Sequence, residues 1–330
     1  MGKKAAKRQH KGSRSHADVT SIKGHGQEGA HNDSEDGSSE EVTPEPNYDG
    51  AENLPAHRTK HLSRLSYRFR SLGITLNLTQ RNDTNSTGSS LWLSSQVLSS
   101  YLIHTYSSKE SRASISAAST PAIKANKANR RAIELGSGTG LLSLLLATLG
   151  WSVLATDIPP VLDTVLRPNV EEGAYQLVNT AQISADQLAV HELDWTTKPN
   201  LWHWDQAGPC TVAPATQSSN DNPDAGTVEH DFELILTADT VYEPSLVRPL
   251  VSIISHLYRT RSGSSKPTVL LALERRDSNH IDGALQVASD DFGLDFKQIP
   301  AKRVRKIFDT LGEGATWSRQ DWDGVEIWKL

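Results

Sequence analysis

The chain has 330 residues, of which 36% are hydrophobic, and its 34 Lys and Arg against 39 Asp and Glu give a net charge of −5. This length allows one large domain or two small ones, and the negative charge argues against a protein that binds nucleic acid generally through phosphate contacts. The single cysteine, Cys210, excludes an intramolecular disulfide and any zinc site that needs two thiolates, and it favours a reducing compartment. The histidines show no metal-ligand spacing, so no metal site is predicted.

Residues 1–60 consist of two blocks of opposite charge. Basic residues are concentrated between Lys3 and Arg14, whereas the charged residues from Glu28 to Glu52 are all acidic. Segments with so few apolar residues cannot bury enough surface to offset chain entropy, so we expect a disordered charged tail. Its basic cluster is either simply solvated or a nuclear-import or RNA-contacting patch. The folded domain is expected over residues 61–330.

The longest uncharged stretch, residues 135–156, has the length of a membrane span. It contains four glycines together with several Ser and Thr, which indicates a loop, a helix and a strand rather than a transmembrane helix. The basic N-terminus lacks the apolar run of a secretory signal. The sequence therefore predicts a cytoplasmic or nuclear protein with no membrane partner.

Apolar periodicity predicts the elements in chain order. The alternation over 67–78 predicts one or two short strands, the spacing over 91–106 predicts a helix, and a polar insertion is expected near 107–129. Strands and helices then alternate, with a second polar insertion near 198–230, which predicts an α/β fold with a mostly parallel sheet covered by helices on both faces. The expected strands are 131–135, 152–156, 188–193, 232–237, 268–273, 294–299 and 325–329, and the expected helices are 141–149, 161–169 and 244–259.

A glycine-rich turn, ELGSGTGL at 134–141, links a predicted strand to a predicted helix. Glycines at such a turn allow positive φ and close approach of a ligand to the backbone, at the edge where parallel sheets bind nucleotides. Asp157 follows Gly136 by 21 residues at the end of the next strand, where a carboxylate accepts hydrogen bonds from both ribose hydroxyls. The alternative is an ordinary tight loop.

The type of nucleotide follows from charge. The spacing is G-x-G-x-G, and Glu134 precedes Gly136 by two positions. An acid is a poor neighbour for a pyrophosphate and a good one for a cationic sulfonium and ammonium, which favours S-adenosylmethionine over a dinucleotide. A dehydrogenase would also need a general acid–base residue, and the sequence indicates none.

Several further motifs follow in order: SLW at 90–92 with Val97 and Leu98, ATDI around Asp157, LDW at 193–195 and ADTVY at 238–242. With the glycine turn, they resemble the family-16 protein-lysine methyltransferases over residues 65–330. LERR at 273–276 and EIWK at 326–329 resemble the branch called methyltransferase-like protein twenty-two. The resemblance implies a Rossmann-like seven-strand methyltransferase fold, S-adenosylmethionine as cofactor, and a protein lysine as acceptor.

Each matched position also has a physical interpretation. Asp194 and Trp195 would bracket the adenine, and Trp92 would pack over the methionine portion, although simple core packing is open for both tryptophans. Asp239 would orient the acceptor amine and take its proton, with Tyr242 offering an aromatic face; alternatively, Asp239 caps the helix at Pro244. The predicted catalytic residues are Asp239 and Tyr242, and the predicted cofactor-binding residues are Trp92, Glu134, Gly136, Ser137, Gly138, Gly140, Asp157, Asp194, Trp195 and Ala238.

The expected function is therefore methylation of a lysine on a protein substrate by a monomeric enzyme. A methyltransferase acting on a small amine of the nicotinamide type, or a silent interaction module of the same fold, stays open. No N-P-P-Y motif follows the fourth strand, which argues against a nucleic-acid substrate. Glu274, Arg275 and Arg276, at the same edge of the sheet, either shape the substrate entrance or form a structural ion pair.

Overall fold

A seven-stranded sheet forms the centre of the computed structural model, which describes residues 53–81, 87–107, 130–180, 182–198, 230–312 and 316–330. The strand order is β5-β4-β3-β6-β7-β9-β8. Neighbouring strands from β5 to β7 are parallel, and β9 is antiparallel to both β7 and β8. This confirms the predicted mostly parallel sheet. The strands are β3 (Arg131–Leu135), β4 (Ser152–Asp157), β5 (Leu188–Glu192), β6 (Leu234–Ala238), β7 (Thr268–Glu274), β8 (Lys297–Gln298) and β9 (Val325–Lys329).

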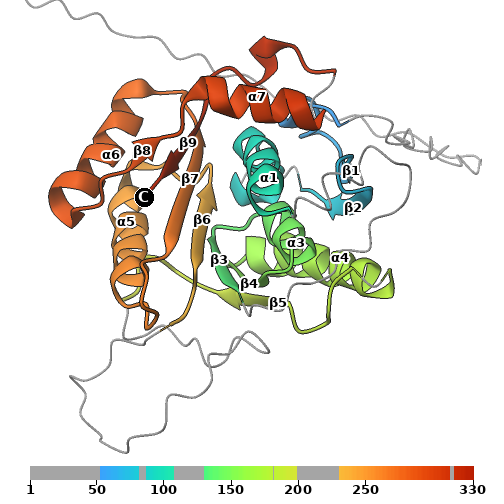
Figure 1. Ribbon diagram of the computed structural model, residues 1–330, viewed down its shortest axis with the longest axis horizontal. Coiled ribbons are helices and arrows are strands. Elements are labelled where there is room, and N and C mark those ends of the chain that lie inside the picture. The colour runs from blue at the N-terminus through green and yellow to red at the C-terminus, as the bar shows by residue number, and fades with distance from the viewer. Residues whose placement is uncertain (1–52, 82–86, 108–129, 181, 199–229, 313–315) are drawn as a thin grey trace, which may run out of the picture. The chain divides into compact units, whose positions relative to one another are not determined.

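Helices cover both faces of this sheet (Figure 1). Because side chains alternate along a strand, Ala132 of β3 belongs to one buried cluster, while Ile133 and Leu135 belong to another. The first cluster packs against α1 (Leu93–Tyr106), α3 (Leu141–Thr148), α4 (Arg167–Asn179) and α7 (Ala301–Leu311). The second packs against α5 (Pro244–Arg259) and α6 (Ser278–Phe292). The predicted arrangement of a sheet with helices on both faces is therefore confirmed.

The two strands predicted within 67–78 form an antiparallel hairpin, β1 (Arg64–Phe69) and β2 (Ile74–Thr79), in a sheet of its own. Asn169, a fully buried residue of α4, connects this hairpin to the rest of the domain. Its amide nitrogen donates to the carbonyls of Thr79 and Thr139, both at 3.0 Å, and its oxygen accepts from the Thr79 N–H at 2.7 Å. One side chain thus holds the hairpin against the glycine-rich turn.

Some predicted boundaries differ from the structure. The helix expected over 161–169 begins with a π turn at Leu162–Leu166 and continues as α4 to Asn179. Pro168 does not end the helix, because proline is tolerated in the first turn. Helices α6 and α7 were not predicted. Of the strand expected over 294–299, only Lys297–Gln298 pairs with β9. Residues 1–52, 108–129 and 199–229, which include Cys210 and most of both predicted insertions, lie outside the described residues.

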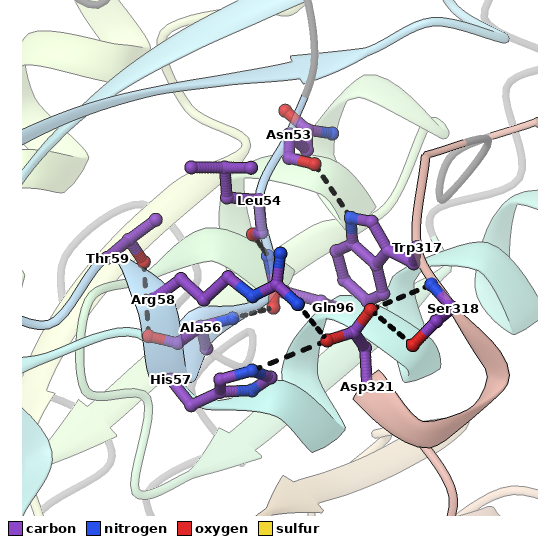
Figure 2. Close-up of polar contacts among 10 residues, drawn as sticks. All are labelled: Asn53, Leu54, Ala56, His57, Arg58, Thr59, Gln96, Trp317, Ser318 and Asp321. Atoms are coloured by element: carbon purple, nitrogen blue, oxygen red, sulfur yellow. Dashed lines mark hydrogen bonds and ion pairs between the residues drawn. The ribbon is translucent and has the colours of Figure 1, made fainter.

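Residues 53–60, which we name the N-terminal strap, contact α1 and the C-terminal part of the chain (Figure 2). Gln96 of α1 accepts from the Ala56 N–H at 2.7 Å and donates to the Leu54 carbonyl at 2.9 Å. Trp317 donates its indole N–H to the Asn53 carbonyl at 2.7 Å. The strap is ordered by partners that are distant in sequence, and these are not visible in its own composition.

Asp321 joins the strap to the C-terminal part of the chain. One carboxylate oxygen lies 2.7 Å from Arg58 Nη2 and 3.5 Å from His57 Nε2, and the other accepts from the N–H and hydroxyl of Ser318 at 2.7 and 2.9 Å. Asp321→Ala should lower the free energy of unfolding by about 1–2 kcal/mol through loss of the cap and the charge-assisted bond. Urea unfolding measures this, with exposed Asp323→Ala as control. Equal losses in the two variants would contradict the assigned role.

None of the helices in the described ranges has both the length and the apolar character needed to cross a bilayer. Among the same residues, no group of three His, Cys, Asp or Glu side chains is arranged to hold a metal ion.

Candidate active site

The carboxyl ends of the five parallel strands meet along one edge of the sheet, at the switch point between β3 and β6 where such sheets bind ligands. A cavity of about 420 Å³ lies at this edge, a volume within the range of small-molecule sites. Residues that follow all five strands line it. The wall includes ten of the predicted site residues: Trp92, Gly136, Ser137, Gly138, Asp157, Asp194, Trp195, Ala238, Asp239 and Tyr242.

The glycine-rich turn forms one wall because its backbone leaves no room for side chains. Gly136 and Gly138 have φ of 70° and 53°, the region that favours glycine. A Cβ on Gly136 would lie 2.8 Å from Thr240 Cγ2 and 3.1 Å from Trp195 Cζ2, and one on Gly138 would lie 3.1 Å from the Gly88 carbonyl oxygen. Both positions therefore favour glycine, because any other residue would be strained by its φ and crowded by neighbouring protein atoms.

Asp157 ends β4 and faces the cavity. One carboxylate oxygen accepts from the Gly138 N–H at 2.8 Å, and the other accepts from the Ile158 N–H at 2.9 Å. Burial raises the pKa of this carboxyl, and the two N–H bonds oppose that shift. Since a carboxylate oxygen can accept more than one hydrogen bond, both oxygens retain acceptor capacity for a pair of hydroxyls.

Glu134 and Gly140 lie outside the cavity wall, unlike the other predicted site residues. Glu134 is 2% exposed and accepts a hydrogen bond from the Ser143 hydroxyl. Burial raises its pKa to about 8, so its side chain is mainly neutral at pH 7. The interaction of Glu134 with a cationic ligand stays a prediction. Gly140 instead precedes α3 as its N-cap, with φ of 79°.

The raised pKa of Glu134 predicts a specific dependence of stability on pH. In the unfolded chain the carboxyl ionises near 4.5, whereas in the folded protein it retains its proton up to about 8. The folded state therefore binds more protons between these values, and stability falls as the pH rises through this window. Glu134→Gln should remove that contribution. Urea unfolding from pH 4.5 to 8 should show the variant gaining stability relative to the natural chain, and parallel curves would contradict the assignment.

Two tryptophans contribute to the wall from different elements. Trp195 follows β5, lies beside Gly136 in the cavity wall, and packs against the second buried cluster, which contains residues of α5. Its ring therefore both lines the cavity and contributes to the core. Its indole N–H is buried without a hydrogen-bond partner among the described residues. Trp92 is the N-cap residue of α1 and donates its indole N–H to the Thr87 carbonyl at 2.8 Å. Because its ring is half-buried and lines the cavity, Trp92 is not simply a core residue.

Asp194 occupies the wall next to Trp195 at the end of β5. Its Oδ1 accepts from the N–H and the hydroxyl of Thr196 at 2.8 and 2.7 Å. These two bonds fix the side chain, and the carboxylate retains lone pairs for a donor in the cavity.

Asp239 follows β6 in a constrained conformation. Its φ of 55° is the only positive value at a non-glycine residue in the described ranges. Oδ1 accepts from the Glu274 N–H at 3.0 Å, while Oδ2 is buried and has no hydrogen bond of normal geometry within the described part of the chain. Burial raises the pKa of Asp239, and the Ser94 hydroxyl and Arg276 guanidinium oppose that shift.

The alternative role of Asp239 as a helix cap is wrong. Glu243 is the N-cap of α5, and its carboxylate accepts from the Ser245 N–H at 3.2 Å. Tyr242 lies at the mouth of the cavity with 49% of its surface exposed. The 239–242 loop thus presents a buried carboxylate and an exposed aromatic ring to the same cavity.

Residues that follow β7 complete the wall. Glu274 and Arg276 line the cavity and form an ion pair with each other, so both interpretations of this pair hold. Arg275 is paired with Glu326 at 2.8 Å and with Asp282 at 2.7 Å and does not line the cavity. His280 of α6 also lines it, with Nε2 buried and unpartnered among the described residues. Sequence reasoning missed His280 because it did not predict α6.

Comparisons with known proteins agree with this geometry. Residues 72–205 match a protein-family model described as lysine methyltransferase. The chain is 31% identical over 148 residues to the protein N-lysine methyltransferase METTL21A of Danio rerio, covering 45% of this chain and 50% of that protein. It is 28% identical over 144 residues to methyltransferase-like protein 22 of Mus musculus, covering 44% of this chain and 33% of that protein. The match thus spans half or less of each relative's length.

Among solved structures, the human methyltransferase 10 domain containing protein aligns with a TM-score of 0.35 and 12% identity, over 62% of this chain and 72% of that chain. A likeness of this size carries no weight for the assignment. The family match does carry weight, because it includes the glycine turn, Asp157, Asp194 and Trp195 and ends before Asp239. Residues 72–205 of this chain are thus similar to the model of the lysine methyltransferase family.

Proposed function

We propose that this protein transfers a methyl group from S-adenosylmethionine to a lysine side chain of a protein substrate. The observation that carries the proposal is the single cavity in which the glycine turn, Asp157, the Asp194–Trp195 pair and the 239–242 loop come together. The family match adds the acceptor class, since its description names lysine.

The residues present fit the proposed cofactor. The Gly136–Gly138 backbone forms a cradle that a Cβ would fill, Asp157 offers two acceptor oxygens for the ribose hydroxyls, and Trp195 has an unpartnered indole N–H among the described residues. Asp194 and Trp195 would hold the adenine, and Trp92 would cover the methionine portion. When bound, the cofactor supplies an electrophilic methyl group on a sulfonium, and its displacement needs mainly alignment.

The acceptor end of the cavity would be formed by Asp239 and Tyr242. A lysine must be neutral to attack, and a site that excludes water lowers the pKa of its amine. Asp239 lines the cavity, and its carboxylate would accept a hydrogen bond from that amine and take its proton. Tyr242 offers its ring to the cationic group, an interaction of about 0.5–2 kcal/mol.

The test is transfer of labelled methyl groups from S-adenosylmethionine to proteins of a cell extract by the full chain. We expect label in proteins, recovered as methyl-lysine after acid hydrolysis, and loss of label with Asp157→Ala. Label recovered only in small molecules would replace the proposal with the small-amine alternative. Cofactor binding without any transfer would favour the interaction module.

We further propose that the protein acts as a monomer in the cytoplasm or the nucleus, without nucleic acid as substrate. Support comes from the single cysteine, Cys210, and the basic cluster between Lys3 and Arg14, which suits nuclear import. Imaging of the tagged full chain with and without residues 3–14 tests the location. Sedimentation of the purified protein tests whether it is a monomer.

A further inference from the structure

Lys60, at the end of the N-terminal strap, lies against Trp92, a residue of the cavity wall. Its Nζ is 3.4 Å from the centroid of the Trp92 ring, and the Arg276 guanidinium lies 4.6 Å from the same centroid. Trp92 and Arg276 both line the cavity. A lysine of the chain itself is thus held against the aromatic ring that borders the proposed methyl-transfer site, although Lys60 is not part of the wall.

The surroundings of Lys60 resemble those that an acceptor lysine needs. Burial and the Arg276 charge lower the pKa of its amine, and the charges of Asp239 and Glu274 oppose that shift. A lower pKa increases the neutral fraction, which is the nucleophilic form. Asp239, Glu274 and Arg276, which act on Lys60 through their charges, all line the cavity.

The strap positions this side chain. Gln96 holds the backbone of the strap at Ala56 and Leu54, and Asp321 pairs with the Arg58 side chain (Figure 2). Residues 53–60 are therefore a fixed arm rather than a free tail, and the flexible four-carbon stem of Lys60 is the part left to move. Internal transfer requires a change of Lys60 rotamer that moves Nζ from the Trp92 ring into the cavity while the arm stays in place.

From this geometry we propose that Lys60 is an internal acceptor, methylated by the chain that carries it. The inference rests on the proposed function. The Lys60 ammonium first gives one proton to Asp239 or to water, which frees the Nζ lone pair. That lone pair forms a bond to the methyl carbon, and the bond between this carbon and the sulfonium sulfur breaks with its electrons left on sulfur. The methylated amine remains a cation and stays suited to the Trp92 ring.

The experiment uses the purified full chain with S-adenosylmethionine, followed by peptide mass spectrometry. We expect one added methyl mass on the peptide containing Lys60, appearing at a rate independent of protein concentration. Lys60→Arg keeps a cation over Trp92 and should lose the modification. Lys266→Arg is the matched control, because Lys266 lies 5.4 Å from the centroid of another ring, that of Tyr258, away from the cavity, and it should leave the modification unchanged.

A second readout needs no cofactor. Competitive acetylation with trace acetic anhydride as a function of pH reports the pKa and accessibility of each lysine, and the pKa of Lys60 should lie below the ordinary value of a lysine side chain. If Lys60 titrates at the ordinary value of a lysine side chain, or if methyl appears on other lysines and not on Lys60, the internal-acceptor proposal is wrong. A rate that rises with protein concentration would also overturn it, because it indicates transfer between chains.

The design separates this proposal from the proposed function. Calorimetric binding of S-adenosylmethionine and labelling of extract proteins by the same preparation, without methyl on Lys60, would overturn the internal acceptor alone. Absence of both binding and labelling would overturn the two proposals together.

Discussion

Replacing Asp239 by asparagine is expected to lower kcat roughly 100-fold, the lower end of the usual effect of a positioned general base, with little change in the Kd for S-adenosylmethionine. Asparagine tolerates positive φ, so the φ of 55° and the hydrogen bond from the Glu274 N–H can be retained. What is lost is the negative charge of a carboxylate that lines the cavity. Single-turnover transfer to a lysine substrate measures kcat separately from cofactor binding.

The pH profile gives a second measure of the same role. Because burial raises the pKa of Asp239, the rate should fall on the acid side as this carboxylate becomes protonated, and Asp239→Asn should lose that limb. Glu243→Gln is the matched control: this acid lies four residues further along and caps α5 without lining the cavity. Equal kcat in Asp239→Asn and Glu243→Gln would remove Asp239 from the mechanism.

Asp157→Ala should weaken S-adenosylmethionine binding by roughly 30- to 150-fold, from loss of about 2–3 kcal/mol of charge-assisted hydrogen bonding. Two causes act together. The variant loses both acceptor oxygens that face the cavity, and it loses the bond that fixes the Gly138 N–H at 2.8 Å. Calorimetric titration with S-adenosylhomocysteine measures the change without turnover.

Asp157→Asn separates the two causes. The amide oxygen can still accept from the Gly138 N–H, but the side chain has one acceptor instead of two. We expect an intermediate Kd. Asp163 is an exposed acid that pairs with Arg167 one helical turn further on. The control variant Asp163→Asn should bind the cofactor with the same Kd as the natural chain. Unchanged affinity in Asp157→Ala would refute the placement of the ribose.

The sequence predicted those parts of the fold that local pattern determines. Strands of the parallel sheet are short apolar runs, and residues 131–135 were predicted with the boundaries that β3 has. α6 lacks a clear pattern because Gly283 and several acids interrupt it. The order of strap residues 53–60 depends on Gln96, Trp317 and Asp321, which lie 40 or more residues away in sequence.

The same distinction applies to the site. Gly136, Asp157 and Asp194 follow strand ends, so their meeting at one edge follows from parallel topology. Glu134 was predicted to bind the cofactor from its place near the end of the strand. Successive strand residues point to opposite faces of the sheet, and packing decides how deeply each is buried. The structure buries the Glu134 side chain beside Ser143. Lys60 and His280 reach the cavity region through the strap and α6, and neither element was predicted.

The most direct test of the central claim is calorimetric titration of the full chain with S-adenosylmethionine, S-adenosylhomocysteine and NAD in parallel. The cavity described here predicts one molecule of either sulfur nucleotide bound per chain in the micromolar range, and no binding of NAD. Binding of NAD, or absence of binding by both sulfur nucleotides, would contradict the assignment of this cavity to a methyltransferase.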